Sequence, residues 1–527
     1  MKLIRKFWNY LDEAPAGDEE KRPILKILFG NVENRPFLIT GILIAIAEFA
    51  IFKYFYPFAS FIHGDSFVYL DTAFQNLDIN TYPTGYSKFL RLFSVFNKSD
   101  TALVGFQYFL MMGSMFGLIF TLFHFYKPTR PAKIILWATT IFNPVFLYLS
   151  NYICSDALFV SLSMIWFVQL LWMLYKPTTK LILWNAVILF LAFTVRYNAL
   201  FYPGIASITY VLTRSRIIPK VMGLALSIGL IGCFIGYTGS KYKALTGYRQ
   251  FTPFTGWQLA NNALYGYRYI DSASRKPVPK KFEQLDRMVR EYFDSSRDVK
   301  KHPIEGVDAS TFYMWSRGTP LQEYMYKRFE KDSTASDLKR WATVSPLFAE
   351  YGSLLMRMYP KEFFAHYIAI NGLKYYAPPV EFLDSYNMMQ DSVNPIAQEW
   401  FNYKSRAVKT RFKDKKVYVL NFYPILVGTM NVIFVLGLAS FIFLGGYKEK
   451  RLLTKTLILI ASMWLANFVF SVYASPIALR FQLFPILVTI AYAVLLVEFI
   501  VIEAFKKEPI PNFPESANIE SRPVLVH

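Results

Sequence analysis

The segment Phe61-Ile-His-Gly-Asp-Ser-Phe-Val-Tyr-Leu-Asp-Thr-Ala-Phe74 follows the first apolar block of the chain, and it is where polar residues first gather after that block. It carries His63 and Asp65 close together, and a second carboxylate follows at Asp71. An apolar block of about 20 residues is long enough to cross a bilayer. A polar stretch directly after such a block is expected at the mouth of a bundle of membrane helices. We therefore expect any chemistry of this protein to occur here.

The composition favours a membrane protein over a soluble one. The chain has 527 residues, of which 54% are hydrophobic and 18% are charged, whereas soluble domains carry about 25% charged residues. The apolar residues gather in blocks of about 20, which suits a hydrocarbon core about 30 Å thick. These features predict an all-α polytopic membrane protein.

The formal net charge of +20 comes from Lys and Arg residues that concentrate in short connectors between apolar blocks. Basic residues in such connectors orient the spans and meet anionic lipid headgroups. The sequence contains no basic soluble module of a recognisable nucleic-acid-binding type. We therefore expect membrane lipids, and no nucleic acid, as partners.

The apolar blocks predict about ten transmembrane helices. The predicted spans cover residues 37–56, 101–126, 133–149, 156–175, two short spans within 181–213, 219–238, 417–444, 456–474 and 481–504. Within 181–213 the two short spans meet at Arg196. With two spans rather than one, the basic residues at 214–220 fall on the same side as the other basic connectors.

These spans divide the chain into five parts. The parts are a basic N-terminal segment (1–36), a module of about seven helices (37–238) that includes an outer loop (57–100), a hydrophilic segment (239–416), a module of three helices (417–504) and a tail (505–527). Both termini are then cytoplasmic, and the large segment lies outside a plasma or inner membrane. A helical period of apolar residues within that segment predicts a mostly helical extracytoplasmic domain.

Asp65 is the leading candidate for chemistry. A carboxylate in a water-filled cleft can act as a general base on an acceptor hydroxyl, or it can bind a divalent ion. The alternative is that Asp65 only caps the helix that follows it. Asp156 opens the fourth predicted span on the same side. It is either a helix cap as well or a second carboxylate that reaches the same compartment from a different helix.

Arg196 and Arg480 interrupt apolar blocks on that same side of the membrane. An Arg at the outer interface can bind a phosphate with two parallel hydrogen bonds, or it can simply extend towards lipid headgroups. Residues 84–97 place their aromatic and aliphatic side chains on one helical face. This pattern predicts a helix lying in the membrane interface, which could cover a lipid-accessible groove or merely anchor the loop.

The start of the large segment, residues 257–267, is rich in aromatic and amide side chains. Trp257, Asn261 and Asn262 could contact a sugar or an acceptor, although the same residue types also suit an ordinary packed helix. The sequence has no Walker loop, GxGxxG, HExxH or GxSxG motif, so an enzyme that uses ATP or a nucleotide-linked sugar has no support.

Four short motifs, in this order and on one side of the membrane, resemble the GT-C superfamily of integral-membrane glycosyltransferases. The motifs are Gly64-Asp65-Ser66 with Tyr69, Ser155-Asp156-Ala-Leu-Phe159, Arg196-Tyr197 and Arg480-Phe481. The similarity is greatest to the protein O-mannosyltransferase and aminoarabinose-transferase type, and it covers the first seven spans best.

The resemblance implies a polyprenyl-phosphate sugar as donor, a reaction on the outer face, and an Asp of the first outer loop as catalytic base. That role falls to Asp65. The family often has a second acid next in this loop, where this chain has Ser66, so Asp156 or His63 could supply the second polar group. Arg196 and Arg480 would bind the lipid phosphate.

The expected reaction is an inverting transfer of the sugar to a hydroxyl of a glycan, lipid or protein acceptor. The resemblance implies no certain cofactor, and it leaves a divalent metal ion open. The alternative is a non-catalytic membrane protein that binds or flips a lipid-linked glycan, or that acts as a scaffold. Convergence of Asp65, Asp156 and Arg480 within about 10 Å around one outer cavity favours the enzyme.

Overall fold

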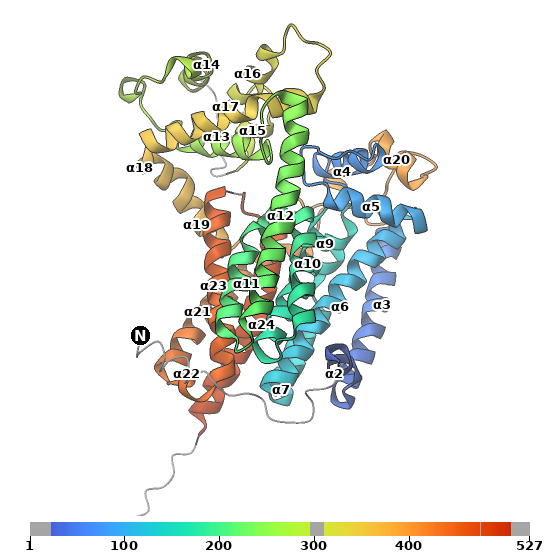
Figure 1. Ribbon diagram of the computed structural model, residues 1–527. Coiled ribbons are helices and arrows are strands. Elements are labelled where there is room, and N and C mark those ends of the chain that lie inside the picture. Colours follow the sequence, from blue (N-terminus) through green and yellow to red (C-terminus); the bar gives the residue numbers. More distant parts are fainter. Residues whose placement is uncertain (1–22, 296–309, 475, 507–527) are drawn as a thin grey trace, which may run out of the picture.

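The computed structural model describes residues 23–295, 310–474 and 476–506, and most of the chain in these ranges is helical (Figure 1). The described residues contain no strand, only three isolated bridges. The predicted all-α class is therefore confirmed for this part of the chain. Most of the predicted N-terminal segment and nearly all of the tail lie outside the described residues.

Eight helical segments among the described residues are long and apolar enough to cross a membrane. They are Val32–Phe55, which includes α3 (Arg35–Phe55); α6 (Asp100–Tyr126); Arg130–Asn151, which joins α7 (Arg130–Ile141) and α8 (Pro144–Asn151); α9 (Asp156–Tyr175); α12 (Ile217–Thr246); Tyr418–Phe443, which includes α21 (Tyr423–Phe443); α23 (Arg451–Ala474); and α24 (Leu479–Ala504). These helices support an integral membrane protein.

The ambiguous block forms two shorter helices, α10 (Thr179–Val195) and α11 (Tyr202–Leu212), which are joined by a short 3₁₀ turn. They have 17 and 11 residues, against the roughly 20 that a perpendicular span requires. Residue 196 ends α10, as the sequence predicts. The expected total of ten spans stays a prediction.

Helices α6 and α9 form the centre of the bundle. Most of their side chains are buried, whereas α3 and α12 expose most of theirs at its edge. Close aromatic stacking joins neighbouring helices here, for example between Trp166 of α9 and Tyr202 of α11, whose ring centroids lie 4.0 Å apart. Helices that are apolar on all sides can be buried in the centre of a bundle, and they can lie at its edge when lipid rather than water surrounds the bundle.

The loop over residues 57–100, which the sequence predicts to be outer, forms two helices, α4 (Asp65–Phe74) and α5 (Gly85–Phe96), which lie across one end of the bundle (Figure 1). The helix predicted over 84–97 is thus present. Its exposed side includes Leu92, Val95 and Phe96, of which Phe96 is 81% exposed. Large exposed apolar side chains on an amphipathic helix suit a position in the membrane interface.

The hydrophilic segment divides between two hydrophobic clusters. Its first part folds around α13 (Phe254–Tyr267) and α17 (Asp337–Met358) and has a core of its own. Helix α12 extends from the bundle up to this part (Figure 1).

The same first part includes the smaller helices α14 (Glu283–Asp294), α15 (Phe312–Trp315), α16 (Pro320–Arg328), α18 (Pro360–Phe363) and α19 (Ala369–Tyr376). A turn of π-helix, Phe364–Ile368, links the last two. The expectation of a mostly helical segment is therefore met in the described residues.

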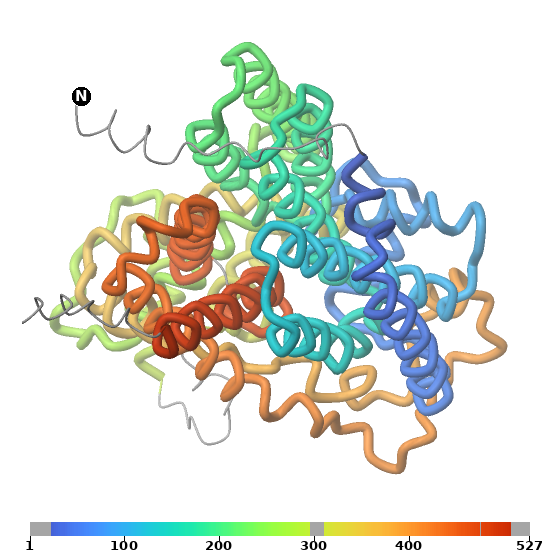
Figure 2. The backbone as a smooth tube through the Cα atoms, turned by 90° about the horizontal axis from the view of Figure 1, so that it is seen from below, coloured from blue at the N-terminus to red at the C-terminus, as the bar shows by residue number. Residues whose placement is uncertain are grey.

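The second part, residues 377–417, returns to the bundle. Its buried residues Leu383 and Val408 belong to the same cluster as the bundle helices. It passes α20 (Pro395–Phe401) and reaches the end of α3, where the backbone N–H of Arg411 donates to the carbonyl of Phe55 at 2.9 Å. Figure 2 shows this orange segment running along the bundle to the blue helix α3. The sequence had suggested a single domain over 239–416.

Gly352 permits the close packing of α17 against α13, and we predict that Gly352→Ala destabilises this core. A Cβ atom at Gly352 would lie 2.5 Å from the backbone carbonyl of Leu259. Overpacking of this kind costs about 1–3 kcal/mol. Unfolding in detergent, followed by the total tryptophan fluorescence, to which Trp257 and Trp341 of this core contribute, measures the change. The matched control is Gly372→Ala, because nothing lies within 4 Å of that Cβ position. An equal loss in both variants would contradict the prediction.

Candidate functional site

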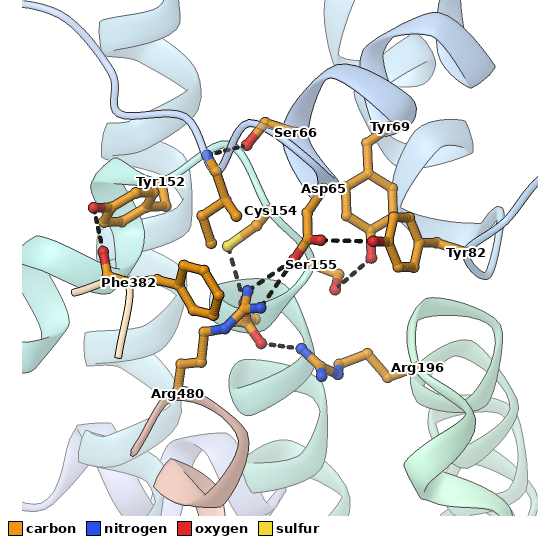
Figure 3. A network of polar contacts seen from close by, with 12 residues as sticks. Asp65, Ser66, Tyr69, Tyr82, Tyr152, Cys154, Ser155, Arg196, Phe382 and Arg480 are labelled. Carbon is orange, nitrogen blue, oxygen red and sulfur yellow. Dashed lines mark hydrogen bonds and ion pairs between the residues drawn. The ribbon is translucent and has the colours of Figure 1, made fainter. Parts of the chain in front are cut away.

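Four charged residues from four distant parts of the chain are joined by ion pairs. Figure 3 labels three of them, Asp65, Arg196 and Arg480. Asp65 is the first residue of α4, Asp156 is the first residue of α9, Arg196 directly follows α10, and Arg480 lies in the first turn of α24. Each therefore occupies a helix end, as the sequence predicts. Together they form what we call the charge network.

Arg480 is the centre of the charge network. Both of its terminal nitrogens donate to Oδ2 of Asp65 at 3.0 Å, and Nη1 also donates to Oδ2 of Asp156 at 3.1 Å. The rings of Phe382 and Phe481 flank the guanidinium, with centroids 4.8 and 4.3 Å from its carbon. The Arg480 side chain is only 5% exposed. Its Nε is buried and has no hydrogen-bond partner among the described residues.

Asp156 is the most buried member, with its side chain 1% exposed. Arg196 pairs with Oδ1, Arg480 pairs with Oδ2, and the thiol of Cys154 donates to Oδ2 at 3.0 Å. Burial, followed by the charge of Asp156, raises the pKa of the Cys154 thiol well above its usual value, so the thiol keeps its proton. Ser155 occupies the N-cap position of α9, and the hydrogen bonds of the Asp156 side chain join it to Arg196, Arg480 and Cys154, so the helix-cap interpretation is not supported.

Asp65 lies at the more open edge of the network, where its side chain is 19% exposed. Its second oxygen accepts a hydrogen bond from the hydroxyl of Tyr82 at 2.8 Å. Burial, with the nearby charge of Asp65, raises the pKa of Tyr82 well above its usual value, so this phenol remains a donor. Asp65 is likewise not the N-cap residue of α4, because that position falls on Gly64. Its side chain is instead committed to Arg480 and Tyr82.

The charge network lies between the bundle and the first part of the hydrophilic segment. The ring of Tyr82 has centroid distances of 6.2 Å to Phe254 and 6.4 Å to Trp315, both of which belong to that segment. From the other side, the hydroxyl of Tyr152 donates to the carbonyl of Phe382 at 2.5 Å. That bond helps to hold the loop carrying Phe382 against Arg480.

The negative charges of two carboxylates balance the positive charges of two guanidinium groups in the charge network. Arg480 occupies the position between Asp65 and Asp156 that a divalent cation would need in order to bridge them. Among the described residues no group of three or more His, Cys, Asp and Glu side chains gathers in a way that could hold a metal ion. The structure therefore assigns no residues to the divalent ion that the sequence leaves open.

His63 lies near the network in sequence, but it makes other contacts. Its ring packs against Phe67 at 5.2 Å between centroids, and its backbone N–H donates to Sδ of Met388 at 3.1 Å. Burial lowers the pKa of His63, so its ring is neutral over more of the physiological pH range. No hydrogen bond or ion pair links it to the four described residues of the charge network.

Trp257, Asn261 and Asn262 lie inside the core of the hydrophilic segment and are completely buried. The indole N–H of Trp257 donates to the carbonyl of Trp341 at 2.9 Å, and the amide of Asn262 donates to the carbonyl of Tyr473 at 3.1 Å. These three side chains hold α13 in place and present no open face to a sugar. This arrangement matches the packed-helix alternative.

The sequence did not indicate Tyr82, Cys154 or Phe382 as members of the site. Phe382 reaches Arg480 from a loop about 100 residues away along the chain, and no local pattern marks it. Tyr82 stands in an unremarkable loop between α4 and α5. Only Cys154 could have been suspected from the sequence, because it lies two residues before the predicted site residue Asp156.

Arg480 is hydrogen-bonded to both Asp65 and Asp156, so the three residues converge, whereas the outer cavity expected around them stays a prediction. Two of the cavities in the described part of the chain, each of about 620 Å³, lie elsewhere, and neither is lined by a member of the charge network.

Comparison of the sequence with models of known protein families finds no match. Comparisons with curated proteins and with solved structures find no match either.

Proposed function

We propose that this protein is a membrane glycosyltransferase that moves a sugar from a polyprenyl-phosphate donor to an acceptor hydroxyl on the outer face of the membrane, with inversion. The observation that carries the proposal is the direct contact of Arg480 with both Asp65 and Asp156 at one end of the bundle. A phosphate-binding guanidinium beside a partly open carboxylate is the minimum that such a transfer needs. The resemblance of the four motifs to GT-C enzymes agrees with it.

Donor binding activates Asp65 in this proposal. Without donor, Asp65 accepts hydrogen bonds from Arg480 and Tyr82, so both of its oxygens are already occupied. A lipid phosphate is a strong ligand for a guanidinium. When the phosphate replaces Asp65 at Arg480, Oδ2 of Asp65 becomes free to act as a base.

The chemical step then balances as follows. The acceptor hydroxyl gives its proton to Asp65, and its oxygen forms a bond to the anomeric carbon on the face opposite the phosphate. The bond between that carbon and the phosphate oxygen breaks, and the electron pair leaves with the polyprenyl phosphate. Arg480 and Arg196 stabilise the charge that develops on this leaving group, while Asp156 holds both guanidinium groups in position.

The lipid tail of the donor would lie beside α5, whose exposed apolar side faces away from the core. Gly85 at the start of this helix packs directly on Thr194 of α10, where a Cβ atom would lie 2.4 Å from the Thr194 carbonyl. That contact fixes the start of α5 against Thr194, which lies two residues before Arg196 in the sequence. The proposed tail site and the proposed phosphate site are therefore joined by one rigid contact.

A transfer assay tests the proposal. Membranes that contain the full chain are incubated with radiolabelled polyprenyl-phosphate hexose, pentose or amino sugar. We expect label to move from the lipid extract to an acceptor fraction with one of these donors, with release of one polyprenyl phosphate per sugar, and only when the chain is present. Absence of transfer with every donor, together with binding of the lipid-linked sugar by the purified protein, would favour the binding or flipping alternative.

A further inference from the structure

The end of the bundle opposite the charge network contains a basic cavity. It has a volume of about 620 Å³ and lies among the last turns of α6, α9 and α24 and the start of α23. Its charged lining residues are Lys127, Arg214, Lys450, Arg451, Lys455, Glu449 and Glu498. Glu498 already accepts a hydrogen bond from the backbone N–H of Thr129, and Glu449 accepts one from Lys506. Five cations and two carboxylates line this cavity, and this excess of positive charge favours an anionic ligand.

The wall of this cavity contains a buried lysine, Lys455. The residue is only 9% exposed and lines the cavity from α23. Among the described residues Lys455 has no hydrogen-bond or ion-pair partner, and the nearby Arg214 repels its charge. A buried ammonium without a partner costs free energy, which an anion in the cavity would recover. We therefore expect an anionic ligand in this cavity to bind Lys455.

An apolar groove adjoins the basic cavity. It also has a volume of about 620 Å³, and it shares the lining residues Thr129, Glu498 and Ile502 with the basic cavity. Its other walls come from α7, α21 and α24 and are apolar, with Ile135, Phe142, Met430, Ile433 and Val494 among them. A basic cavity that continues into an apolar groove fits a ligand with an anionic head and a hydrocarbon tail.

The position along the bundle agrees with a lipid headgroup. Arg480 and Glu498 are 18 residues apart on α24, which corresponds to about 27 Å along a helix that rises 1.5 Å per residue. A bilayer has a hydrocarbon core about 30 Å thick. The charge network and the basic cavity are thus separated by nearly the thickness of that core.

We infer that the basic cavity and the adjoining groove bind one anionic phospholipid of the leaflet opposite the charge network. The phosphate of the headgroup pairs with Lys455, and one acyl chain occupies the groove beside Met430. The site is separate from the proposed transfer site, and the inference does not depend on the proposed function.

Lipid binding by the purified full chain in detergent tests this inference, with the melting temperature and native mass spectrometry as readouts. We expect phosphatidylglycerol to raise the melting temperature and to remain bound, whereas phosphatidylcholine and inorganic phosphate at equal concentration do neither. Loss of one charged contact in Lys455→Met should weaken phosphatidylglycerol binding by about tenfold or more. The same variant should melt higher than the wild type without lipid, because it removes an unpaired buried charge.

The matched control is Lys448→Met, since Lys448 is exposed at the same end but does not line the cavity. This control should bind phosphatidylglycerol like the wild type. Met430→Trp fills the groove without changing charge and should also weaken lipid binding. Equal binding of phosphatidylglycerol and phosphatidylcholine, unchanged binding by Lys455→Met, or stabilisation by inorganic phosphate alone would each overturn the inference.

Discussion

Asp65→Asn is expected to abolish sugar transfer while the protein still folds. An amide cannot take a proton from the acceptor hydroxyl, and loss of a general base lowers rates by about 10²- to 10⁴-fold. The substitution keeps the shape of the side chain and an oxygen that can accept from Tyr82 or Arg480. Asp65 is also the more exposed of the two carboxylates, so folding depends on it less. Transfer from the polyprenyl-phosphate sugar identified with the wild type is the measurement.

The control for this prediction is Asp71→Asn. Asp71 lies on the same helix, six residues further along, and its carboxylate accepts a hydrogen bond from Gln75 at 2.6 Å. It has no contact with the charge network, so this variant should transfer sugar at the wild-type rate. An active Asp65→Asn variant would exclude Asp65 as the base. Equal loss in both variants would point to damage of α4 rather than to chemistry.

Asp65→Asn also tests whether the lipid phosphate displaces Asp65 from Arg480 when the donor binds. The variant keeps Arg480 and Arg196, and it removes the carboxylate that competes with the lipid phosphate for Arg480. It should therefore bind polyprenyl phosphate at least as tightly as the wild type, although it transfers no sugar. Weaker binding by the variant would contradict displacement of Asp65 by phosphate, and would leave the base role to be judged from transfer alone.

The members of the charge network could be predicted because each is a charged residue at the end of an apolar block. Membrane helices must end near such residues, since charge is costly at membrane depth. Sidedness then follows from the order of spans, so Asp65, Asp156, Arg196 and Arg480 were expected at one end of the bundle. The helical class could be predicted for the same reason.

Other features could not be predicted because they depend on contacts between distant segments. The path of residues 377–417 along the bundle relies in part on backbone hydrogen bonds, such as that from Arg411 to Phe55, which leave no mark on residue type. Aromatic and amide side chains serve a protein core as well as a sugar site. The sequence alone therefore could not distinguish the buried Trp257 and Asn261 from surface ligands.

The ion pairs of Arg480 likewise could not be predicted from the sequence, because they join residues that are far apart along the chain. The sequence indicated two arginines that could bind phosphate, and each is paired with a carboxylate in the structure. A buried arginine without a counter-charge would destabilise the protein before any donor arrives. The carboxylates supply that counter-charge. In the proposed function, Asp65 gives up its place at Arg480 to the donor phosphate, whereas Asp156 keeps both arginines in position.

Asp156→Asn is expected to lower stability far more than Asp65→Asn does. Asp156 is 1% exposed and pairs with both arginines, so its neutralisation leaves buried positive charge behind. Breaking a buried pair costs about 3–5 kcal/mol, and the lower end applies here because Arg480 keeps its contact with Asp65. Denaturant unfolding of the purified protein in mixed micelles measures this loss. A change within about 1 kcal/mol of the wild type, as is common for exposed pairs, would contradict it.

A double-mutant cycle separates the pairing from the general cost of changing a buried side chain. Arg196→Met alone leaves Asp156 paired with Arg480, and Asp156→Asn alone leaves Arg196 without its partner. If the ion pair carries the effect, the double variant should lose clearly less stability than the sum of the two single losses. Strict additivity would mean that each residue acts through packing alone. A favourable coupling would show that Asp156 holds Arg196 through charge, as the proposed role in positioning a phosphate site requires.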